Sequence, residues 1–544
     1  MQKYVIGVDF GTLSARAVLV ELSTGAQVCV SEFKYPHAIM SKKDFPSAKF
    51  PETFAMQHPS DYIQALKNVV SDIKAQTGIA KEQIQGVGID FTTCTVLPID
   101  ENFQPLCLKE EFKGEPHAFV KLWKHHGAEK EAELITKELE KYDAEMLASY
   151  GGKVSSEWFF PKVLETFNKA RHVYDKTYCF IEAGDYLTSL LTGNLQRNAC
   201  VTGFKALWSK KKGFLKKDFW ARIDNDFANT IEDKIIGQVL PEGQKAGVVN
   251  ETGSELFGLS EGTFVAVAIG DAHASMPALS IAESGKLMLI LGTSACHILI
   301  DEKDVSVDGI CGKVQDGIIP NYVAYEAGQT CFGDAFEWFK NSALPKEYFE
   351  RAKSAGTDVF SYLNGLIKDD AVGQNGLLAI DWWNGNRTPY ADFELSGVIL
   401  GLTLLTKPEH IYRAIMEAHC FGTKRIIDIY RKSNICVNEV IVSGGIANKN
   451  PLLMQILSDV LGVKISVSKS KQSGAVGSAI YASVACGAFS NLQDAAKVIA
   501  EKDMIEYFPN MENNKKYELL YDEYLKLTKY FAETNQVLKK IKKI

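Results

Sequence analysis

The sequence predicts an α/β protein built from two domains that flank a cleft. Its 544 residues are too many for one ordinary domain, since a soft average is about 150 residues per domain. A strand–turn–strand unit opens the chain, and a related unit opens its second half. No low-complexity linker separates the halves, so we expect the two domains to touch and to enclose a site.

Composition excludes several other classes of protein. Hydrophobic residues make up 46% and charged residues 23% of the chain, which is typical of a globular protein and unlike a disordered one. The net charge of −7 offers no overall attraction for nucleic acid. One basic run, Lys210-Lys211-Lys212 near Phe214 and Trp220, is an alternative nucleic-acid patch, but a solvated turn explains it as well.

Cysteine usage and the N-terminal residues favour a cytoplasmic protein. The 11 cysteines are an odd number without a CxxC pair, which is typical of reduced, mostly buried thiols rather than of disulfides or a zinc site. Asp9 interrupts the first apolar stretch before it could form a signal-peptide core. No run approaches the ~18 apolar residues of a membrane span. We therefore expect no membrane partner and no nucleic-acid partner.

The first domain is expected to open with a meander of three strands. Apolar runs predict strands at residues 5–10, 15–22, 27–35 and 84–91. Apolar residues at helical spacing predict a helix over 59–71, before the fourth of these strands. The order is a β-β-β-α-β unit.

The second domain repeats this beginning with a strand, a turn and a return strand. Its strands are predicted at residues 286–291, 295–300, 440–442 and 463–467, and its helices at 409–431, 451–461 and 474–486. Residues 443–450 are predicted as a loop and the last thirty as a charged surface helix. Because the crossing between domains lies near 271–284, the predicted domains are 1–278, on the substrate side, and 279–544 with its helical tail.

Two turns carry residues that suit phosphate binding. Gly11 lets the backbone approach a ligand closely, and the exposed amides with the Thr12 hydroxyl form an anion nest. Asp9 beside them suits a magnesium–phosphate group, with Mg²⁺ held through water. Gly292-Thr293-Ser294 offers the same chemistry at the matching turn of the second domain. One such turn alone is a common structural element, but two on paired domains predict an ATP site.

A third glycine-rich segment lies between an apolar strand and a helix. Gly444 and Gly445 remove side chains where a flat ring or a ribose has to lie on the backbone, and Asn448 belongs to the same segment. The alternative is a tight strand-to-helix loop with no ligand. The chain has no GxxxxGK[ST] P-loop and no GxGxxG after a strand, so the two commonest nucleotide folds lack their signatures.

One carboxylate is placed for acid–base chemistry. Asp271 follows the apolar strand predicted over 263–269, near the crossing between domains. A carboxylate there, beside an ATP site, suits a general base that takes a proton from a substrate hydroxyl. The alternative is that Asp271 caps the helix that follows. His273 is interpreted as a packed core histidine and is given no role.

These motifs together resemble the FGGY family of carbohydrate kinases, a branch of the actin, hexokinase and Hsp70 ATPase superfamily. Residues 397–402 and 410–417, seven residues apart, match the family's C-terminal signature. Six further segments resemble the L-ribulose kinases within the family: residues 7–12, 56–62, 88–98, 116–126, 152–158 and 384–387. The family's N-terminal signature is only partly met, around 161–164. The resemblance covers nearly the whole chain and implies two ribonuclease H-like domains that flank an active-site cleft, with ATP and Mg²⁺.

The resemblance also implies roles for residues that are unremarkable by themselves. Thr93, where this group often carries alanine, and Lys205 would hold the sugar from the first domain. Glu326 would reach the sugar from the second domain. Asp271 would also contact the sugar and act as the base on its terminal hydroxyl.

The implied activity is ATP-dependent phosphorylation of L-ribulose, with D-ribulose as a further substrate, at the 5-hydroxyl in L-arabinose degradation. The product is ribulose 5-phosphate. One alternative is a kinase of xylulose or of another ketose or polyol. Another is a non-catalytic sensor of sugar or ATP. The expected partner is a small ketopentose substrate. A homodimer is kept as a further expectation.

Overall fold

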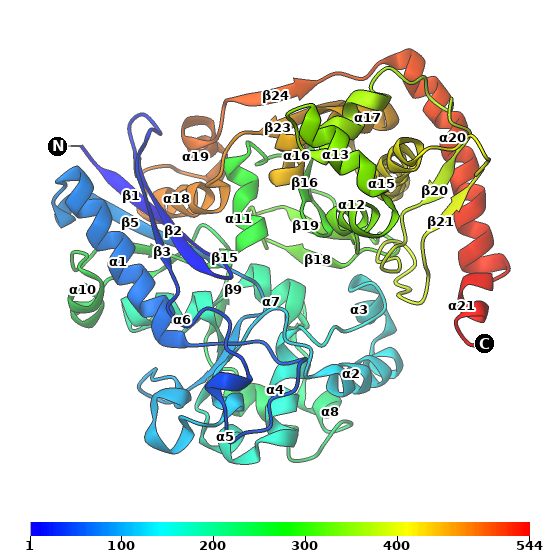
Figure 1. Cartoon of the computed structure of the whole chain (residues 1–544). Coiled ribbons are helices and arrows are strands. Elements are labelled where there is room, and N and C mark those ends of the chain that lie inside the picture. The colour runs from blue at the N-terminus through cyan, green and yellow to red at the C-terminus, as the bar shows by residue number, and fades with distance from the viewer. Residues whose placement is uncertain (1) are drawn as a thin grey trace.

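The computed structural model describes residues 2–544 as two lobes, each built on a seven-stranded mixed sheet (Figure 1). The first sheet has the order β13-β14-β5-β1-β2-β3, and β15 also pairs with β5. Its strands are β1 (Tyr4–Phe10), β2 (Ser14–Glu21), β3 (Gln27–Lys34), β5 (Ile84–Phe91), β13 (Lys245–Val248), β14 (Phe264–Ala266) and β15 (Ile269–Gly270). The predicted opening meander is confirmed.

The second sheet has the order β18-β19-β17-β16-β22-β23-β24. Its strands are β16 (Gly285–Leu291), β17 (Ala295–Asp301), β18 (Gly312–Gln315), β19 (Val323–Gln329), β22 (Val437–Ser443), β23 (Lys464–Ser468) and β24 (Met504–Tyr507). In each sheet the opening strand pairs antiparallel with the next strand and parallel with a later one: β1 with β2 and β5, β16 with β17 and β22. The prediction of two related α/β units is therefore confirmed.

Two helices rich in small residues pack together between the sheets. α11 (Asp271–Ala278) packs against α18 (Ser473–Ala485), and α18 in turn lies on β1 and β5. Glycine permits these close approaches: a Cβ at Gly7 would lie 1.9 Å from the Ala475 carbonyl oxygen, and one at Gly477 would lie 1.8 Å from the Ala274 carbonyl oxygen. A helix from the second half of the chain thus supports the sheet of the first half.

Further elements extend the first lobe below its sheet in the view of Figure 1. They include β4 (Met56–Gln57), β6 (Val96–Ile99), β7 (Val120–Lys121) and β8 (Cys179–Glu182), which form a four-stranded sheet, and helices α2 (Glu129–Tyr142), α3 (Ala144–Ser149), α4 (Phe159–Lys169), α5 (Arg171–Lys176), α6 (Ala183–Thr192) and α7 (Ala199–Lys205). A buried ion pair lies inside this part, with Lys121 Nζ 2.7 Å from Glu165 Oε2. Lys162 Nζ is also buried and donates to the backbone oxygens of Cys94 and Leu122. These contacts make a fixed base for the residues that face the second lobe.

The helices of the second lobe surround its sheet, and they include α12 (Gly333–Trp338), α13 (Lys346–Ser354), α14 (Val359–Ile367), α15 (Pro408–Lys432), α17 (Pro451–Leu461) and α20 (Met511–Lys529). α20 belongs to the tail that was predicted as a surface helix, but one of its faces is buried. Tyr517, Tyr521 and Tyr524, spaced at four and three residues, are buried in the core of this lobe. Tyr524 Oη donates to Asp381 Oδ1 at 2.7 Å.

Two other predicted elements need correction. Residues 443–450 are not a simple loop, because Gly445–Lys449 form the helical turn α16. The apolar stretch 263–269 is not one strand but two short ones, β14 and β15. In segment 443–450, Gly444 has φ = 108°, and this turn of the chain allows the next residues to start a helix.

The basic run is explained by a turn. Lys210, Lys211 and Lys212 lie between the short strands β10 (Trp208–Ser209) and β11 (Gly213–Phe214). Lys210 pairs with Asp316, and Lys212 Nζ lies 2.6 Å from Asp143 Oδ2, so carboxylates balance two of the three charges. Within residues 2–544, the helices are all too short or too polar to cross a membrane.

Candidate active site

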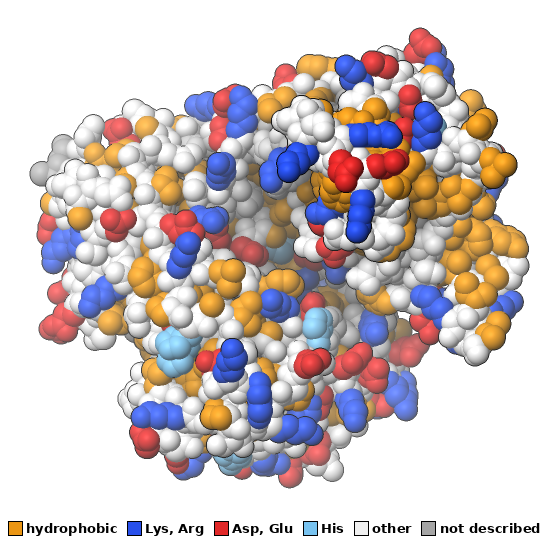
Figure 2. Space-filling view, viewed as in Figure 1, with side chains coloured by type: hydrophobic (Ala, Val, Ile, Leu, Met, Phe, Trp, Pro, Cys, Tyr) orange, Lys and Arg blue, Asp and Glu red, His pale blue; other side chains and the backbone are white. Residues whose placement is uncertain are grey.

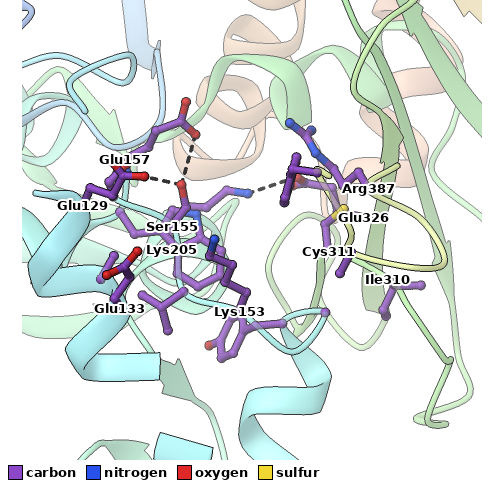
Figure 3. Close-up of a pocket in the computed structure, with 18 residues that line it drawn as sticks. Glu129, Glu133, Lys153, Ser155, Glu157, Lys205, Ile310, Cys311, Glu326 and Arg387 are labelled. Atoms are coloured by element: carbon purple, nitrogen blue, oxygen red, sulfur yellow. Dashed lines mark hydrogen bonds and ion pairs between the residues drawn. The ribbon is translucent and has the colours of Figure 1, made fainter. Parts of the chain in front are cut away.

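A pocket of about 200 Å³ lies between the two lobes, where Figure 2 shows the surface hollowed. Lys205, at the end of α7, enters it from the first lobe, and Glu326, in the middle of β19, enters it from the second (Figure 3). This volume is below the range of about 300–1,000 Å³ that is typical of pockets for drug-sized ligands. The pocket therefore suits a small polar molecule.

Lys205 and Glu326 form an ion pair that joins the lobes at this pocket. Lys205 Nζ lies 3.0 Å from Glu326 Oε1, and His273 Nε2 lies 3.4 Å from Glu326 Oε2. Burial opposes the charged form of both partners, yet each partner's charge outweighs it: the pKa of Glu326 is lowered and that of Lys205 is raised. Both groups are held charged, with a donor and an acceptor ready for sugar hydroxyls.

His273, to which the sequence analysis gave no role, lies beside the pocket. Its ring is buried and stacks on Phe204, with centroids 4.7 Å apart, so it is packed as a core histidine. Its contact with Glu326 nevertheless places it beside the pocket. The signal in the sequence is its position two residues after Asp271, at the start of the same helix.

Asp271 is the first residue of α11, at the end of β15. The cap alternative is wrong: Gly270 is the N-cap, and no side chain caps this helix. Asp271 Oδ1 accepts from the backbone amide of Ala272 at 2.8 Å. Burial, followed by the charge of Asp9, raises the pKa of Asp271 to about 7. A carboxyl with this pKa can exchange a proton near neutral pH, as a general base must.

Thr93 lies next to the start of α11. A Cβ at Gly270 would be 2.6 Å from Thr93 Cγ2, so glycine is needed for this approach. The structure thereby brings Thr93 to the residue that precedes Asp271. Neither Thr93 nor Asp271 lines the pocket that holds Lys205 and Glu326. The four predicted sugar residues therefore form two groups: Thr93 and Asp271 meet at Gly270, and Lys205 pairs with Glu326, which His273 contacts from the helix of Asp271.

Asp9 has a second carboxylate beside it that was not predicted from the sequence. Asp90 on β5 is its register partner across the parallel pair with β1. Asp90 Oδ2 accepts from Ser478 Oγ at 2.6 Å, while Asp90 Oδ1 has no hydrogen-bond partner among residues 2–544. Burial raises the pKa of Asp9, and burial with the charge of Asp9 raises the pKa of Asp90 well above its usual value. An unpaired buried oxygen beside a second carboxylate is a donor set that fits a hard divalent cation such as Mg²⁺.

The two predicted phosphate turns have open glycines. Gly11 follows β1, and a Cβ there would meet only the Ser14 carbonyl oxygen at 3.4 Å. Gly292 follows β16, and a Cβ there would meet only the Ser294 carbonyl oxygen at 3.7 Å. Both lie at the C-terminal ends of equivalent strands. The fold therefore leaves room for a side chain at either position, and the predicted role of the two turns in binding phosphate stays a prediction.

Their neighbours hold the turns in place. Gln57 Nε2 donates to the Thr12 carbonyl oxygen at 2.6 Å, and Trp123 Nε1 donates to Thr12 Oγ1 at 3.1 Å. The Thr293 carbonyl oxygen accepts from the Phe332 amide at 2.7 Å. In each turn these hydrogen bonds are accepted by oxygen atoms of the threonine.

The two glycines of the third segment differ in kind. Gly444 has the positive φ noted above, and a Cβ there would lie 2.2 Å from the Leu291 carbonyl oxygen, so glycine is required by the fold. A Cβ at Gly445 would have no other atom within 4 Å, so this glycine leaves open space beside the backbone. Asn448 Nδ2 donates to the Ser468 carbonyl oxygen at 3.1 Å. The contact with Leu291 places the segment beside Gly292.

Other pocket residues were not predicted as site residues. They are charged or aromatic side chains from both lobes, among them Glu129, Lys153, Glu157, Trp158 and Arg387. Three of these lie in segment 152–158 and one in segment 384–387, which were singled out for their resemblance and not for any role. Arg387 and Lys205 provide positive charge against the carboxylates (Figure 3).

Replacing Gly292 with valine is expected to weaken ATP binding and to leave the fold intact. A side chain at this open turn would occupy the space into which phosphate oxygens must come, while the nearest protein atom is 3.7 Å from its Cβ. We expect the KM for ATP to rise at least ~10-fold with an unchanged melting temperature. The matched control is Gly365→Val in α14, another open position, where a Cβ meets nothing within 4 Å. An unchanged KM for ATP would mean that the turn is only structural.

The fold is shared with solved sugar kinases. The xylulose kinase from Lactobacillus acidophilus superimposes with a TM-score of 0.79 at 17% identity, covering 98% of this chain and 99% of that one. Glycerol kinase from Plasmodium falciparum, solved with ADP, gives a TM-score of 0.75 at 18% identity over 97% and 98%. These likenesses establish the architecture: two lobes of the sugar-kinase type around a cleft.

Sequence comparison then gives the family. The N-terminal domain of the FGGY family of carbohydrate kinases matches residues 4–277, and its C-terminal domain matches residues 287–486. The ribulokinase of Bacillus licheniformis is 41% identical over 537 residues, covering 98% of this chain and 97% of that protein. The ribulokinases of Shouchella clausii and Staphylococcus aureus are 42% and 39% identical, over 100% and 96% of this chain and 98% and 95% of theirs. The chain belongs to the FGGY family of carbohydrate kinases and is a phosphotransferase.

Proposed function

We propose that the protein transfers the γ-phosphoryl group of ATP to the 5-hydroxyl of L-ribulose, and of D-ribulose as a further substrate, in L-arabinose degradation. The observation that carries the proposal is Asp271, a partly buried carboxylate whose pKa is raised to about 7, on the same helix as His273, which contacts Glu326. The relatives named ribulokinase, at about 40% identity over nearly the whole chain, support the choice of sugar.

The sugar would reach from the Lys205–Glu326 pair to Thr93 and Asp271. Lys205 would donate to a sugar hydroxyl and Glu326 would accept from one, because both are charged and one faces the pocket from each lobe. Thr93 would contact the end of the sugar near Asp271. Asp271 would take the proton of the 5-hydroxyl as its oxygen attacks phosphorus. In this arrangement residues 1–278 supply most of the contacts to the sugar, with Glu326 added from the second lobe, and residues 279–544 hold most of ATP.

ATP would bind between the two turns. The amides at Gly11 and Gly292 and the hydroxyls of Thr12, Thr293 and Ser294 would donate to phosphate oxygens. Gly444, Gly445 and Asn448 would lie against the ribose and the base, since Gly445 leaves its surface open. Closure of the lobes would exclude water that could otherwise hydrolyse ATP.

Mg²⁺ would be held beside the first turn. Asp9 would reach it through water, and the unpaired Asp90 Oδ1 offers a second acceptor for its hydration shell. When bound, the ion neutralises charge that develops on the phosphate oxygens. The protein holds the carboxylates of Asp9 and Asp90 close together at this turn, and their burial raises the pKa of each.

The pH dependence of the reaction is expected to report Asp271. A general base works when deprotonated, so kcat/KM for the sugar should fall about tenfold per pH unit below pH 7 and level off above it. An ordinary aspartate, with a pKa near 3.9, would leave the rate flat down to about pH 5. The profile is measured from pH 5 to 9 with coupling enzymes in excess. A flat profile from pH 5 to 8 would remove the proton-accepting role from this carboxylate.

The second candidate is a kinase of xylulose or of another ketose or polyol. Solved structures named xylulose kinase share the fold at 17–20% identity, which carries no preference for a sugar. A sensor without catalysis is less well supported, because a binding protein has no need of a carboxylate with a raised pKa at this place. An assay of ADP release with L-ribulose, xylulose and the polyols separates these: a rate with xylulose or a polyol alone would favour the second candidate, and no rate above the sugar-free value with any of them would favour the sensor. We also propose that the enzyme works in the cytoplasm. Its oligomeric state, monomer or homodimer, is a separate question that the proposed reaction does not depend on.

A further inference from the structure

Away from the pocket, three metal-type ligands meet on the first lobe. One ligand atom each from His37, His58 and Asp61 lies within 4.8 Å of the others. Among residues 2–544, this is the one group of three histidine, cysteine or acidic side chains that comes so close together. We propose that it is a binding site for a transition-metal ion such as Zn²⁺, separate from the Mg²⁺ that accompanies ATP.

The three side chains are already brought together by the fold. His37 follows β3, His58 is the N-cap of α1 (Pro59–Thr77), and Asp61 is in the first turn of that helix. His37 Nδ1 lies 2.6 Å from Asp61 Oδ1, and the backbone amide of His37 donates to Asp61 Oδ2 at 3.0 Å. The two imidazole rings stack with centroids 4.4 Å apart. Little chain movement is needed to place three ligands around one ion.

Ser60 holds the His58 ring at its Nδ1 atom. The Ser60 backbone amide donates to His58 Nδ1 at 3.3 Å, and Ser60 Oγ lies 2.5 Å from the same nitrogen. Nδ1 therefore carries the lone pair in the metal-free protein, as an N-cap acceptor must. Coordination through Nε2 requires the other tautomer, in which Nδ1 donates to Ser60 Oγ; histidine ligands commonly donate their second ring N–H in this way. This change of tautomer is one cost of binding the ion.

Access and chemistry indicate the class of ion. The side chain of His37 is 42% exposed, so an ion can enter from solvent, whereas Asp61 is buried. Two imidazoles and one carboxylate suit Zn²⁺, Co²⁺ or Ni²⁺, while Mg²⁺ and Ca²⁺ prefer oxygen ligands. Three protein ligands leave coordination positions for water. The positive end of α1 opposes a cation, and the Asp61 charge offsets it, so we expect moderate rather than very tight binding.

The site adjoins the first phosphate turn but does not include it. His58 follows Gln57, whose side chain donates to the Thr12 carbonyl oxygen. Because no residue is shared with the turns or the pocket, ion binding should not need ATP or sugar. The proposal can thus be tested without any measurement of activity, and it does not depend on which sugar the enzyme phosphorylates.

The test uses the full-length protein without an affinity tag and stripped of metal. Co²⁺ is titrated while its visible d–d absorption is recorded, and Zn²⁺ binding is measured by calorimetry in the presence of millimolar Mg²⁺. We expect saturation near one ion per chain. His37→Ala and His58→Ser should each weaken binding at least tenfold; serine at position 58 keeps an N-cap acceptor for α1. Thermal melting of the metal-free variants checks that they fold.

His172→Ala is the matched control. This histidine is also exposed and lies 3.4 Å from a single carboxylate, Glu115, but has no third ligand among residues 2–544. Its loss should leave Co²⁺ and Zn²⁺ binding unchanged. The proposal is overturned if the wild type shows no saturable binding, or if either His37→Ala or His58→Ser binds the ion as the wild type does.

Discussion

Asp271→Asn is expected to lower kcat by ~10²–10⁴-fold while the KM for the sugar changes little. Asparagine keeps the shape of the side chain and an oxygen that can accept from the Ala272 amide, but it cannot take a proton. The sugar hydroxyl would then have to give its proton to water during phosphoryl transfer. Steady-state kinetics with saturating ATP measure the effect, and a variant that keeps more than a tenth of the wild-type kcat would place the base elsewhere.

The same substitution should make the protein more stable. Folding raises the pKa of Asp271 from its usual 3.8 to about 7, so the folded state binds this proton more tightly than the unfolded state does. Stability therefore falls as pH rises between these values, and the full cost of the buried charge is present above pH 7. We expect Asp271→Asn to melt at a higher temperature than the wild type, with a larger difference at pH 8 than at pH 5.

Asp185→Asn is the matched control for both effects. Burial also raises the pKa of Asp185 to about 7, and its Oδ1 accepts from Asn198, but it does not line the pocket. Asparagine can keep that acceptor. Its kcat should stay within about twofold of the wild type, which separates loss of a base from loss of any buried carboxylate.

Lys205→Met is expected to raise the KM for the sugar by at least ~10²-fold. The substitution removes a donor to the sugar and leaves Glu326 buried without its strongest partner, and losing one member of a buried pair commonly costs about 3–5 kcal/mol. The melting temperature should fall as well. The KM for ATP should change far less, because Lys205 is proposed to contact the sugar and not ATP.

The double variant Lys205→Met with Glu326→Gln separates binding from folding. Without the negative charge on Glu326, no unpaired buried charge remains at this pair, so the melting temperature should recover above that of Lys205→Met alone. The KM for the sugar should stay raised, since both charged contacts are gone. If the double variant recovers both the melting temperature and the wild-type KM for the sugar, the pair stabilises the fold but does not bind the sugar. Arg413→Met, which breaks another buried pair with Glu417 2.9 Å away in α15, should lower stability without changing the KM for the sugar.

The parts of the site that the sequence predicts are those built from neighbouring residues. The turns at Gly11 and Gly292 and the carboxylate at Asp271 each follow an apolar strand, and the structure places each at a strand end. Lys205 and Glu326 are 121 residues apart, so no spacing rule joins them; only the family resemblance pointed to both. Asp90 is a lone acid in a buried strand, and it gains meaning only from its register with Asp9.

The errors in the fold have similar causes. The helical turn at Gly445–Lys449 was predicted as a loop because two glycines argue against a helix, whereas Gly444 turns the chain and leaves the next residues free to coil. The tail was predicted as a surface helix from its charge. The tyrosines at 517, 521 and 524 carry a readable helical period that predicts burial on one side.

The proposed function is tested most directly by kcat/KM for L-ribulose, D-ribulose, xylulose, ribitol and glycerol, measured by ADP release with the wild type and with Asp271→Asn. We expect the highest value for L-ribulose and the next for D-ribulose, with phosphate on the 5-hydroxyl of the product. Asp271→Asn should lower the rate with every accepted sugar at least ~10²-fold. A higher kcat/KM for xylulose or a polyol than for L-ribulose, or ADP release that does not depend on Asp271, would show that the proposed reaction is wrong.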